Sequence, residues 1–185
     1  MEIFLCRHGE TEWTRSGRHT SHTDISLTEI GKNQSILLGK RLPPCDLVLT
    51  SPLKRSRETC QLAHLKGEIC PDATEWDYGQ YEGLTHDQID PLWNLFTEGA
   101  PGGETPAQVA TRADRLVKKL RAHHGNAILF SHGHFLRVLA ARWLGLKPEQ
   151  GWFFFLSVAS LSILGFEHDR PVIKLWNDTS HLTEQ

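Results

Sequence analysis

The sequence predicts an α/β fold built around a mostly parallel sheet, and two observations lead to this fold class. Short apolar runs are followed by a polar loop and then by a helical pattern of apolar residues, and this order recurs three times along the chain. The apolar runs are continuous instead of alternating with polar residues, as is typical of parallel strands that helices cover on both faces. At 185 residues the chain is long enough to bury a substantial core, and we expect one domain over residues 1–185.

The first strand and helix start almost at the first residue. Residues 3–6 are all apolar and are followed at once by Arg7-His8-Gly9, which predicts a buried strand that ends in a polar loop. Residues 26–29 read Ser-Leu-Thr-Glu, a capping-box pattern. We therefore expect a helix from about this point to the proline pair that follows Leu42.

The second strand and helix are shorter. Residues 46–50 predict a buried strand, and Ser51-Pro52 directly after it offers an N-cap and a first-turn proline. The helix that we expect next carries Arg55 and Arg57. This part of the chain therefore places two guanidinium groups just beyond the end of a strand.

Residues 67–83 follow no regular pattern. Acidic and aromatic side chains crowd around Gly79 and Gly83 there, a composition more typical of a site loop than of a core element. Glu75 and Glu82 belong to this segment, so we expect it to contribute carboxylates to a site.

The remaining elements complete the sheet and its cover. The capping box Thr-Pro-Ala-Gln at residues 105–108 starts a helix that apolar spacing carries to about residue 123. Residues 127–130 form the third apolar run, which Ser131-His132-Gly133-His134 follows. A helix comes next, with Leu136, Leu139, Ala140, Trp143 and Leu144 on one face. Two further strands are expected around residues 161–166 and 172–176.

Charge and composition exclude several classes of function. The 20 basic and 22 acidic residues are interleaved and give a net charge of −2, so we expect neither a general nucleic-acid binder nor a protein that binds anionic membranes. The longest apolar stretch, residues 152–166, is interrupted by serines and is too short to cross a membrane, so we interpret it as paired buried strands. Four cysteines without a CxxC motif are typical of free thiols in a reducing compartment, which predicts a cytoplasmic protein.

Basic and imidazole side chains follow three strand ends. Arg7 and His8 follow the first, Arg55 and Arg57 lie just beyond the second, and His132 follows the third. Parallel strands of one sheet end at the same edge, so these groups are expected to meet there. Arginines bind phosphate oxygens through paired N–H groups, and imidazoles act as nucleophiles or proton carriers. This arrangement predicts a site of phosphoryl transfer.

Four motifs also resemble a known family. In chain order they are LCRHGET at residues 5–11, SPLKRSRET at 51–59, EWDYGQYEG at 75–83 and SHG at 131–133. Together they resemble the histidine phosphatase superfamily, in its phosphoglycerate mutase-like branch. Within that branch, residues 17–24, EWDYG and FSHGH are most similar to sedoheptulose-1,7-bisphosphatase-type sugar phosphatases. The resemblance implies a three-layer α/β/α sandwich, phosphoglycerate mutase-like, as a single histidine phosphatase domain.

The same resemblance implies roles for five residues. His8 becomes the nucleophile that carries the phosphoryl group as phosphohistidine, and Arg7, Arg57 and His132 hold the phosphoryl oxygens. Glu75 becomes the proton donor to the leaving alcohol. A neutral imidazole that attacks in line, cations at the equatorial oxygens and a protonated carboxyl at the leaving oxygen agree with the chemistry of phosphoryl transfer. Since side chains supply the positive charge, we expect no metal and no other cofactor.

The expected function is metal-independent hydrolysis of phosphomonoesters on small phosphorylated metabolites, in particular sugar phosphates or bisphosphates. A phosphoglycerate mutase-type phosphotransferase is the alternative. Residues 83–103 are compact where the cofactor-dependent mutases carry additional basic residues, which favours the phosphatase. We expect a small-molecule phosphate ester as the partner, with no nucleic acid and no membrane, and leave open whether the chain forms homo-oligomers.

Four residues are candidates for substrate binding by the same resemblance. They are Thr14, Thr20, Ser21 and Gly133. Thr14 departs from the family pattern, because phosphoglycerate mutases have asparagine at this position. The contact that this residue makes with substrate is therefore open.

Three further residues keep two interpretations each. Arg55 either touches the substrate or is only a neighbour of the site, and Glu82 either orients its loop or is a surface acid. His134 is more typical of a cap or a packing residue than of a catalyst. The aromatic side chains of Trp13, Trp76 and Tyr78 either line the pocket or fill the core.

Other chemistries find less support in the sequence. No cysteine is followed six positions later by arginine, as a cysteine phosphatase requires, and no GxxxxGK[ST] motif of a nucleotide-dependent kinase is present. His132 and His134 lack a third residue at a spacing suited to zinc. A catalytically inactive phosphate-binding module would lack the nucleophile or the acid, and here both candidates are present.

Overall fold

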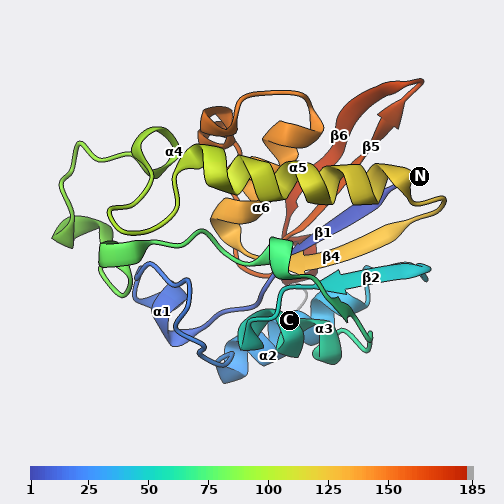
Figure 1. The fold of residues 1–185 in the computed structure, drawn as a ribbon. Coiled ribbons are helices and arrows are strands. Elements are labelled where there is room, and N and C mark those ends of the chain that lie inside the picture. The colour runs from blue at the N-terminus through green and yellow to red at the C-terminus, as the bar shows by residue number, and fades with distance from the viewer. Residues whose placement is uncertain (183–185) are drawn as a thin grey trace.

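A six-stranded sheet runs through the described part of the computed structural model, residues 1–182. Its strands lie in the order β3-β2-β4-β1-β5-β6 (Figure 1). The strands β3, β2, β4 and β1 are parallel, and β5 is antiparallel to both β1 and β6. The predicted mostly parallel sheet is therefore confirmed. The strands are β1 Ile3–Arg7, β2 Leu47–Thr50, β3 Glu68–Ile69, β4 Ala127–Ser131, β5 Leu161–Glu167 and β6 Arg170–Asp178.

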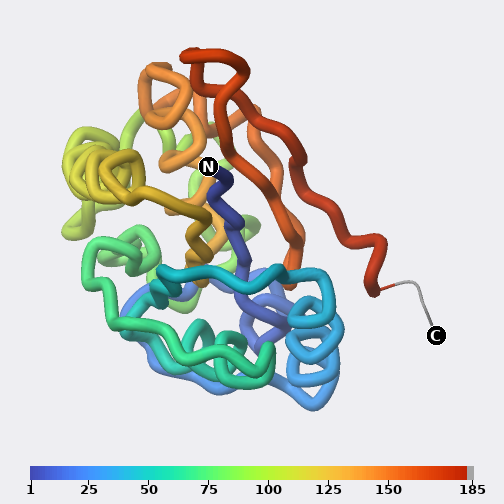
Figure 2. Tube along the Cα trace, turned by 90° about the vertical axis from the view of Figure 1, so that its right-hand side faces the viewer, coloured from blue at the N-terminus to red at the C-terminus, as the bar shows by residue number. Residues whose placement is uncertain are grey.

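Helices cover both faces of this sheet, so the fold has three layers as expected. The helices α5 and α6 pack on one face, and α2 and α3 pack on the other (Figure 1). Figure 2, turned by 90°, shows α5 and α2 on opposite sides of β1. The helices are α1 Glu12–Arg15, α2 Glu29–Gly39, α3 Lys54–Leu62, α4 Leu95–Glu98, α5 Pro106–Ala122 and α6 Gly133–Trp143. Short 3₁₀ helices are η1 Pro71–Ala73, η2 Gly79–Tyr81, η3 His86–Gln88, η4 Pro148–Phe153 and η5 Ser180–Leu182.

The continuous apolar strands explain why helices cover both faces. In β1, Leu5 belongs to the same buried cluster as Leu129 of β4 and Leu116 of α5. Its neighbour Phe4 points to the other face, where it joins a cluster with Leu38 of α2. Each such side chain contributes about 1.5–3 kcal/mol when it leaves water. Burial on both faces therefore holds β1, and the site at its end, in the middle of the fold.

The strand register brings separate segments of the chain to one edge of the sheet. Arg7 at the end of β1 pairs with Ser131 at the end of β4, and β2 lies on the other side of β4. The loops continue these contacts, since His8 N donates to Ser131 O and Ser51 N donates to Phe130 O, both at 3.0 Å. The expected meeting of three strand ends is therefore observed.

Two helix starts differ from the predicted ones. The N-cap of α2 is Thr28, two residues beyond Ser26. The N-cap of α3 is Leu53, whose side chain makes no capping bond. The predicted cap, Ser51, instead has its Oγ 2.7 Å from His132 Nε2. The Ser51 hydroxyl thus pairs with His132 at the sheet edge instead of capping α3.

Residues 152–160 form no strand, since 152–153 end η4 and the rest of the segment is irregular. Because β5 begins only at Leu161, the predicted pair of strands over 152–166 is wrong in its first half. Arg137 of α6 donates to the carbonyl oxygen of Trp152 at 2.7 Å. The Arg137 side chain thus bonds a carbonyl group that a neighbouring strand would otherwise have paired.

The helix α5 begins as predicted and is the longest in the described chain. Thr105 and Gln108 form the expected capping box, and the apolar side of the helix is buried. Neither α5 nor any other helix within residues 1–182 has both the length and the apolar character needed to cross a membrane.

Candidate active site

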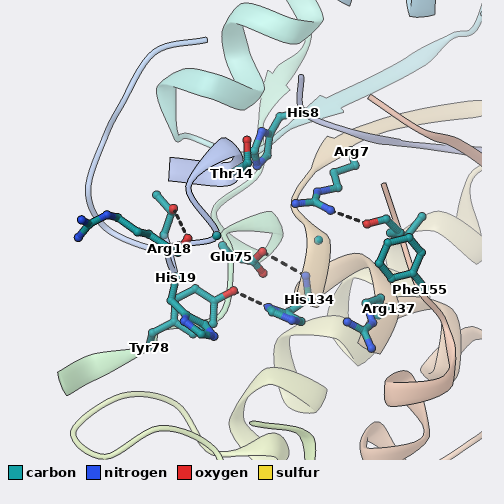
Figure 3. Close-up of a pocket in the computed structure, with 14 residues that line it drawn as sticks. Arg7, His8, Thr14, Arg18, His19, Glu75, Tyr78, His134, Arg137 and Phe155 are labelled. Carbon is teal, nitrogen blue, oxygen red and sulfur yellow. Dashed lines mark hydrogen bonds between the residues drawn. The ribbon is translucent and has the colours of Figure 1, made fainter. Parts of the chain in front are cut away.

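A pocket of about 230 Å³ opens where β1 and β4 end. Figure 3 shows the 14 residues that line it. Six of the predicted site residues are among them, namely Arg7, His8, Thr14, Thr20, Glu75 and Gly133. Three predicted residues do not line it, namely Ser21, Arg57 and His132.

His8 is held as a neutral imidazole with one ring nitrogen occupied. Its Nδ1 lies 2.8 Å from the carbonyl oxygen of Gly9, and because a carbonyl only accepts, Nδ1 carries the proton. Burial and then the charges of Arg55 and Arg7 lower the pKa of His8 well below its usual value of 6.5. The lone pair of the ring is therefore on Nε2, in a side chain that lines the pocket.

His132 lies beside His8 and is fully buried. The two ring centroids are 5.2 Å apart. Ser51 Oγ is 2.7 Å from His132 Nε2 and accepts a hydrogen bond from Leu53 N at 3.3 Å, so its own proton is available to Nε2. The ring proton is then on Nδ1, for which the described part of the chain provides no acceptor.

Arg7 reaches the pocket by passing close to a glycine. Its Nη1 donates to the carbonyl oxygen of Leu156. A Cβ atom at position 133 would lie 3.1 Å from Arg7 Cζ, which is closer than ordinary contact, so Gly133 contributes to the site by its lack of a side chain. Burial lowers the pKa of Arg7, and the charge of Glu75 offsets this only in part.

Arg55 is the second arginine beside the two histidines. It is fully buried, and after burial its charge is the largest cause of the lowered pKa values of His8 and His132. Its Nη2 donates to the carbonyl oxygens of Thr20 and Ser21 at 3.0 and 3.2 Å. These acceptors are neutral, so no carboxylate pairs with the guanidinium charge, which acts on His8 and His132 although Arg55 is not among the residues that line the pocket.

The prediction that Arg57 belongs to the phosphoryl pocket is corrected by its position. Arg57 is exposed and lines a separate hollow with Thr50 and Cys60. Residues two apart in an α-helix point about 200° apart, so Arg57 has to face outward when Arg55 faces inward. Which arginine reaches the site depends on which face of α3 packs against the sheet. The motif alone does not show which face that is.

Glu75 is fixed by backbone donors at the start of α6. Its Oε1 accepts from Phe135 N at 2.8 Å and from Trp76 N at 2.9 Å, and its Oε2 accepts from His134 N at 3.1 Å. His134 and Phe135 lie in the first turn of α6, where N–H groups have no partner within the helix and the helix dipole favours an anion. The carboxyl, on a side chain that lines the pocket, therefore has one defined orientation.

Glu82 fastens the loop that contains Ser21. Its Oε2 accepts from Ser21 N at 2.8 Å and Ser21 Oγ at 2.7 Å, and its Oε1 accepts from Thr23 N at 3.0 Å. Burial raises the pKa of Glu82, but these hydrogen bonds outweigh it and keep the pKa below its usual value of 4.5. Ser21 therefore supports Glu82 and Arg55 instead of facing the pocket, which corrects its predicted place among the substrate contacts.

The two pocket threonines use their hydroxyls to shape the wall. Thr14 Oγ1 accepts from Thr11 N at 2.8 Å as part of the capping box of α1. Thr20 Oγ1 donates to the carbonyl oxygen of Arg18 at 3.1 Å. Both side chains are thus anchored to the backbone of the loop that forms one side of the pocket.

The pocket wall also contains residues that the sequence reasoning did not assign to it. Gly17, Arg18 and His19 belong to the segment 17–24 that carries the family resemblance, so that segment was a usable signal. Tyr78, for which wall and core were both open, lines the pocket, and so does His134, for which a cap or packing role was favoured. Arg137, Phe155 and Leu156 had no local signal, because they reach the pocket only through the path of residues 152–160 over it.

The two histidines considered for zinc have separate partners. His132 Nε2 pairs with Ser51 Oγ at 2.7 Å, and His134 Nδ1 pairs with Tyr78 Oη at 2.6 Å. Within residues 1–182, no three His, Cys, Asp or Glu side chains are grouped as potential metal ligands.

Comparison with known proteins agrees with this geometry. Residues 3–179 match the family model of the histidine phosphatase superfamily, branch 1. The chain is 41% identical over 189 residues to an acid phosphatase of Mycobacterium tuberculosis, and the match covers 97% of this chain and 93% of the relative. It is 32% identical over 185 residues to the sedoheptulose 1,7-bisphosphatase of Saccharomyces cerevisiae, with 79% and 68% covered. The solved structure of an open reading frame product of Mycobacterium tuberculosis superposes with a TM-score of 0.92 at 38% identity, over 95% of this chain and 96% of that one.

Proposed function

The chain belongs to the histidine phosphatase superfamily. We propose that it hydrolyses small phosphorylated metabolites through a phosphohistidine formed on His8. It is a phosphatase like the relatives that it matches. Sugar phosphates and bisphosphates are the substrates that we propose, because the sequence matches a bisphosphatase over much of its length. The pocket of about 230 Å³ is smaller than the roughly 300–1,000 Å³ of sites for larger organic ligands, which also favours a small leaving group.

His8 carries out the first chemical step in this proposal. Its Nε2 lone pair attacks phosphorus in line, so that an N–P bond forms while the bond between phosphorus and the leaving oxygen breaks. Since the pKa of His8 is lowered by burial and by Arg55 and Arg7, the ring is uncharged at neutral pH and needs no base to activate it.

Three groups stabilise the phosphoryl oxygens. Arg7 and Arg55 donate to carbonyl oxygens and not to carboxylates, so their charge is available to the equatorial oxygens of the transition state. The buried Nδ1–H of His132 is a third donor beside His8. Arg55 takes the role that the resemblance gave to Arg57. With this positive charge in place, we propose that the reaction needs no metal.

Glu75 handles the proton. In its protonated form it gives a proton to the leaving oxygen as the bond to phosphorus breaks, and the alcohol departs. Water then attacks the phosphohistidine, its proton returns to Glu75, and the N–P bond breaks to release inorganic phosphate and neutral His8. The three backbone N–H groups hold the Glu75 carboxyl in one orientation, and the negative charge of a bound phosphate ester opposes their preference for the ionised form, which favours the protonated donor in the substrate complex.

We also propose a cytoplasmic location. All four cysteines are free thiols, and Cys6, Cys60 and Cys70 are buried. Thiols that remain unpaired in a folded protein are typical of reducing compartments.

The observation that carries this proposal is the hydrogen bond from His8 Nδ1 to Gly9 O at 2.8 Å, which leaves Nε2 as the nucleophile. The test compares purified wild type with His8→Ala and with His22→Ala, a variant of an exposed histidine outside the pocket. Hydrolysis of p-nitrophenyl phosphate should fall by at least about 10⁴-fold in His8→Ala, stay unchanged in His22→Ala and be insensitive to EDTA.

The nature of the product separates hydrolysis from phosphotransfer. Phosphorus NMR of a reaction with 3-phosphoglycerate should show inorganic phosphate if this ester is hydrolysed. Accumulation of 2-phosphoglycerate would instead identify a mutase. Activity that survives in His8→Ala would refute the proposed nucleophile.

A further inference from the structure

Tyr78 and His134 form a hydrogen-bonded pair in the pocket wall that the proposed reaction does not use. Tyr78 Oη and His134 Nδ1 are 2.6 Å apart, and both residues line the pocket. Figure 3 shows the two side chains pointing toward each other, on the opposite side of the Glu75 carboxyl from His8. The pair is therefore on the side of the pocket where a leaving group would lie.

The protonation of the pair follows from its surroundings. Burial and then the charge of Glu75 raise the pKa of Tyr78 well above its usual value of 10, so the phenol keeps its proton. Burial and then the charge of Arg137 lower the pKa of His134 well below 6.5, so the imidazole is neutral. The phenol O–H consequently donates to Nδ1, and the proton of the imidazole is on Nε2.

The ring of His134 is held in a defined place. It packs edge-on against Phe96 with ring centroids 5.5 Å apart and lies nearly parallel to His19 at 6.4 Å. The backbone N–H of His134 donates to Glu75 Oε2 at 3.1 Å. The His134 imidazole is therefore held at a fixed position relative to the Glu75 carboxyl.

Within residues 1–182, the His134 ring makes its hydrogen bond through Nδ1. Its Nε2–H group has no acceptor there. The donor is uncharged and belongs to a pocket-lining ring. An uncharged N–H group offers no charge to a second phosphate, but it matches the lone pair of a hydroxyl. The Nε2–H group of His134 therefore fits an alcohol oxygen of the leaving group, while the cations of this pocket that suit a second phosphate are Arg18 and Arg137.

We infer that His134 is a specificity-determining residue whose Nε2–H donates a hydrogen bond to a hydroxyl of the leaving group, and that Tyr78 positions this proton. The inference rests on the proposed phosphatase function and narrows its substrates to phosphate esters of polyols. An ester with a hydroxyl close to the ester oxygen should bind and react better than the same ester without one.

The test uses two esters with three-carbon leaving groups, glycerol 3-phosphate and n-propyl phosphate. Wild type should prefer glycerol 3-phosphate about tenfold in kcat/KM, the effect of one hydrogen bond between uncharged groups. His134→Phe keeps the ring shape and the backbone N–H but has no donor, so the preference should fall to near one. His134→Gln places an amide N–H near the position of Nε2 and should restore much of it.

Two tyrosine variants test the role of the phenol. Tyr78→Phe removes the donor to His134 Nδ1, so the ring proton can move from Nε2 to Nδ1 and leave Nε2 as an acceptor. The preference for glycerol 3-phosphate should therefore fall severalfold. Tyr81→Phe is the matched control, because Tyr81 belongs to the same loop, packs on Trp93 with ring centroids 4.8 Å apart and does not line the pocket. Its preference should equal that of wild type. Thermal unfolding of each variant shows which ones are folded.

The outcomes separate this inference from the proposed function. A wild type that shows no preference, or a His134→Phe variant that keeps it, would overturn the inference. Equal losses on both esters in His134→Phe would also overturn it, because they would mean that His134 acts only through Glu75 or the fold. If p-nitrophenyl phosphate is hydrolysed equally by wild type and His8→Ala, the proposed function itself has failed.

Discussion

Arg55 and Arg57 lie two residues apart on α3 and face opposite sides of it. Arg55 is fully buried beside His8 and His132, and its guanidinium donates to carbonyl oxygens of the neighbouring loop. Arg57 is exposed and lines another hollow. Because a transition state for phosphoryl transfer is stabilised by cations within reach of its oxygens, only the first of these arginines is placed to contribute.

Matched substitutions separate the two arginines. Arg55→Lys keeps the charge but loses the paired N–H groups, and we expect kcat/KM for p-nitrophenyl phosphate to fall about a hundredfold or more. Arg57→Lys should leave kcat/KM within about twofold of wild type. Steady-state kinetics with a thermal unfolding curve for each variant check this. A large loss in Arg57→Lys with little loss in Arg55→Lys would show that the assignment of the second arginine is wrong.

The role of Glu75 predicts an effect that depends on the leaving group. A sugar hydroxylate is a poor leaving group and needs a proton, whereas p-nitrophenolate needs almost none. Glu75→Gln should therefore slow phosphoenzyme formation from sugar phosphates by about a hundred- to ten-thousandfold and slow the reaction of p-nitrophenyl phosphate far less. Single-turnover kinetics measure both. Glu82→Gln is the control and should lack this substrate dependence; if it alone shows it, the proton donor is Glu82.

Glu82 predicts a stability effect that depends on pH. Its pKa is below 4.5 in the folded chain because hydrogen bonds from Ser21 and Thr23 outweigh burial. A lowered pKa means that its contribution to the free energy of unfolding is present above pH 4.5 and is lost as the pH falls through the folded value. Glu82→Gln should cost about 1 kcal/mol at pH 7, with a smaller difference from wild type at pH 4. Urea unfolding at both values is the measurement, and a difference that grows in acid would contradict it.

The buried imidazoles predict a second pH dependence. The pKa values of His8 and His132 are lowered well below 6.5, first by burial and then by Arg55. As the pH falls below about 6.5, the unfolded chain takes up protons that the folded chain does not. The free energy of unfolding should be insensitive to these groups above that pH and fall below it, by up to about 1.4 kcal/mol per pH unit for each histidine.

His132→Asn tests this dependence, because it removes one of the two imidazoles. Between pH 6.5 and 5.5 its unfolding free energy should change less steeply with pH than that of wild type, by up to about 1.4 kcal/mol per pH unit, because one imidazole fewer is kept unprotonated by folding. Denaturant unfolding across that range provides the slopes. Equal slopes would mean that His132 takes up its proton over the same pH range in the folded and the unfolded chain.

Most elements of the fold could be predicted because their signals are local. The capping box at Thr105 and Gln108 marks the start of α5, and continuous apolar runs mark the strands of the parallel part of the sheet. The meeting of His8 and His132 also follows from the sequence, since parallel strands end at one edge.

The remaining parts of the site depend on interactions distant in the sequence. The helix α3 has few apolar residues and buries polar ones, including Arg55 and Thr59, so apolar spacing does not reveal which face points inward. The wall formed by Phe155 and Leu156 depends on how residues 152–160 cross the pocket. In both cases hydrogen bonds to partners more than 30 residues away in the chain hold the backbone or side chain in place, such as Arg55 to Thr20 O and Arg7 to Leu156 O.

If His8 is the nucleophile, turnover forms a covalently phosphorylated His8, and this intermediate can be trapped. Wild type is mixed with a labelled phosphate ester, quenched rapidly without acid, and digested for mass spectrometry. We expect a phosphoryl group on the peptide that contains His8, labile in acid and stable in alkali as a phosphoramidate is, and no such group in His8→Ala. A label that persists in acid, or one that remains in His8→Ala, would show that His8 is not the nucleophile.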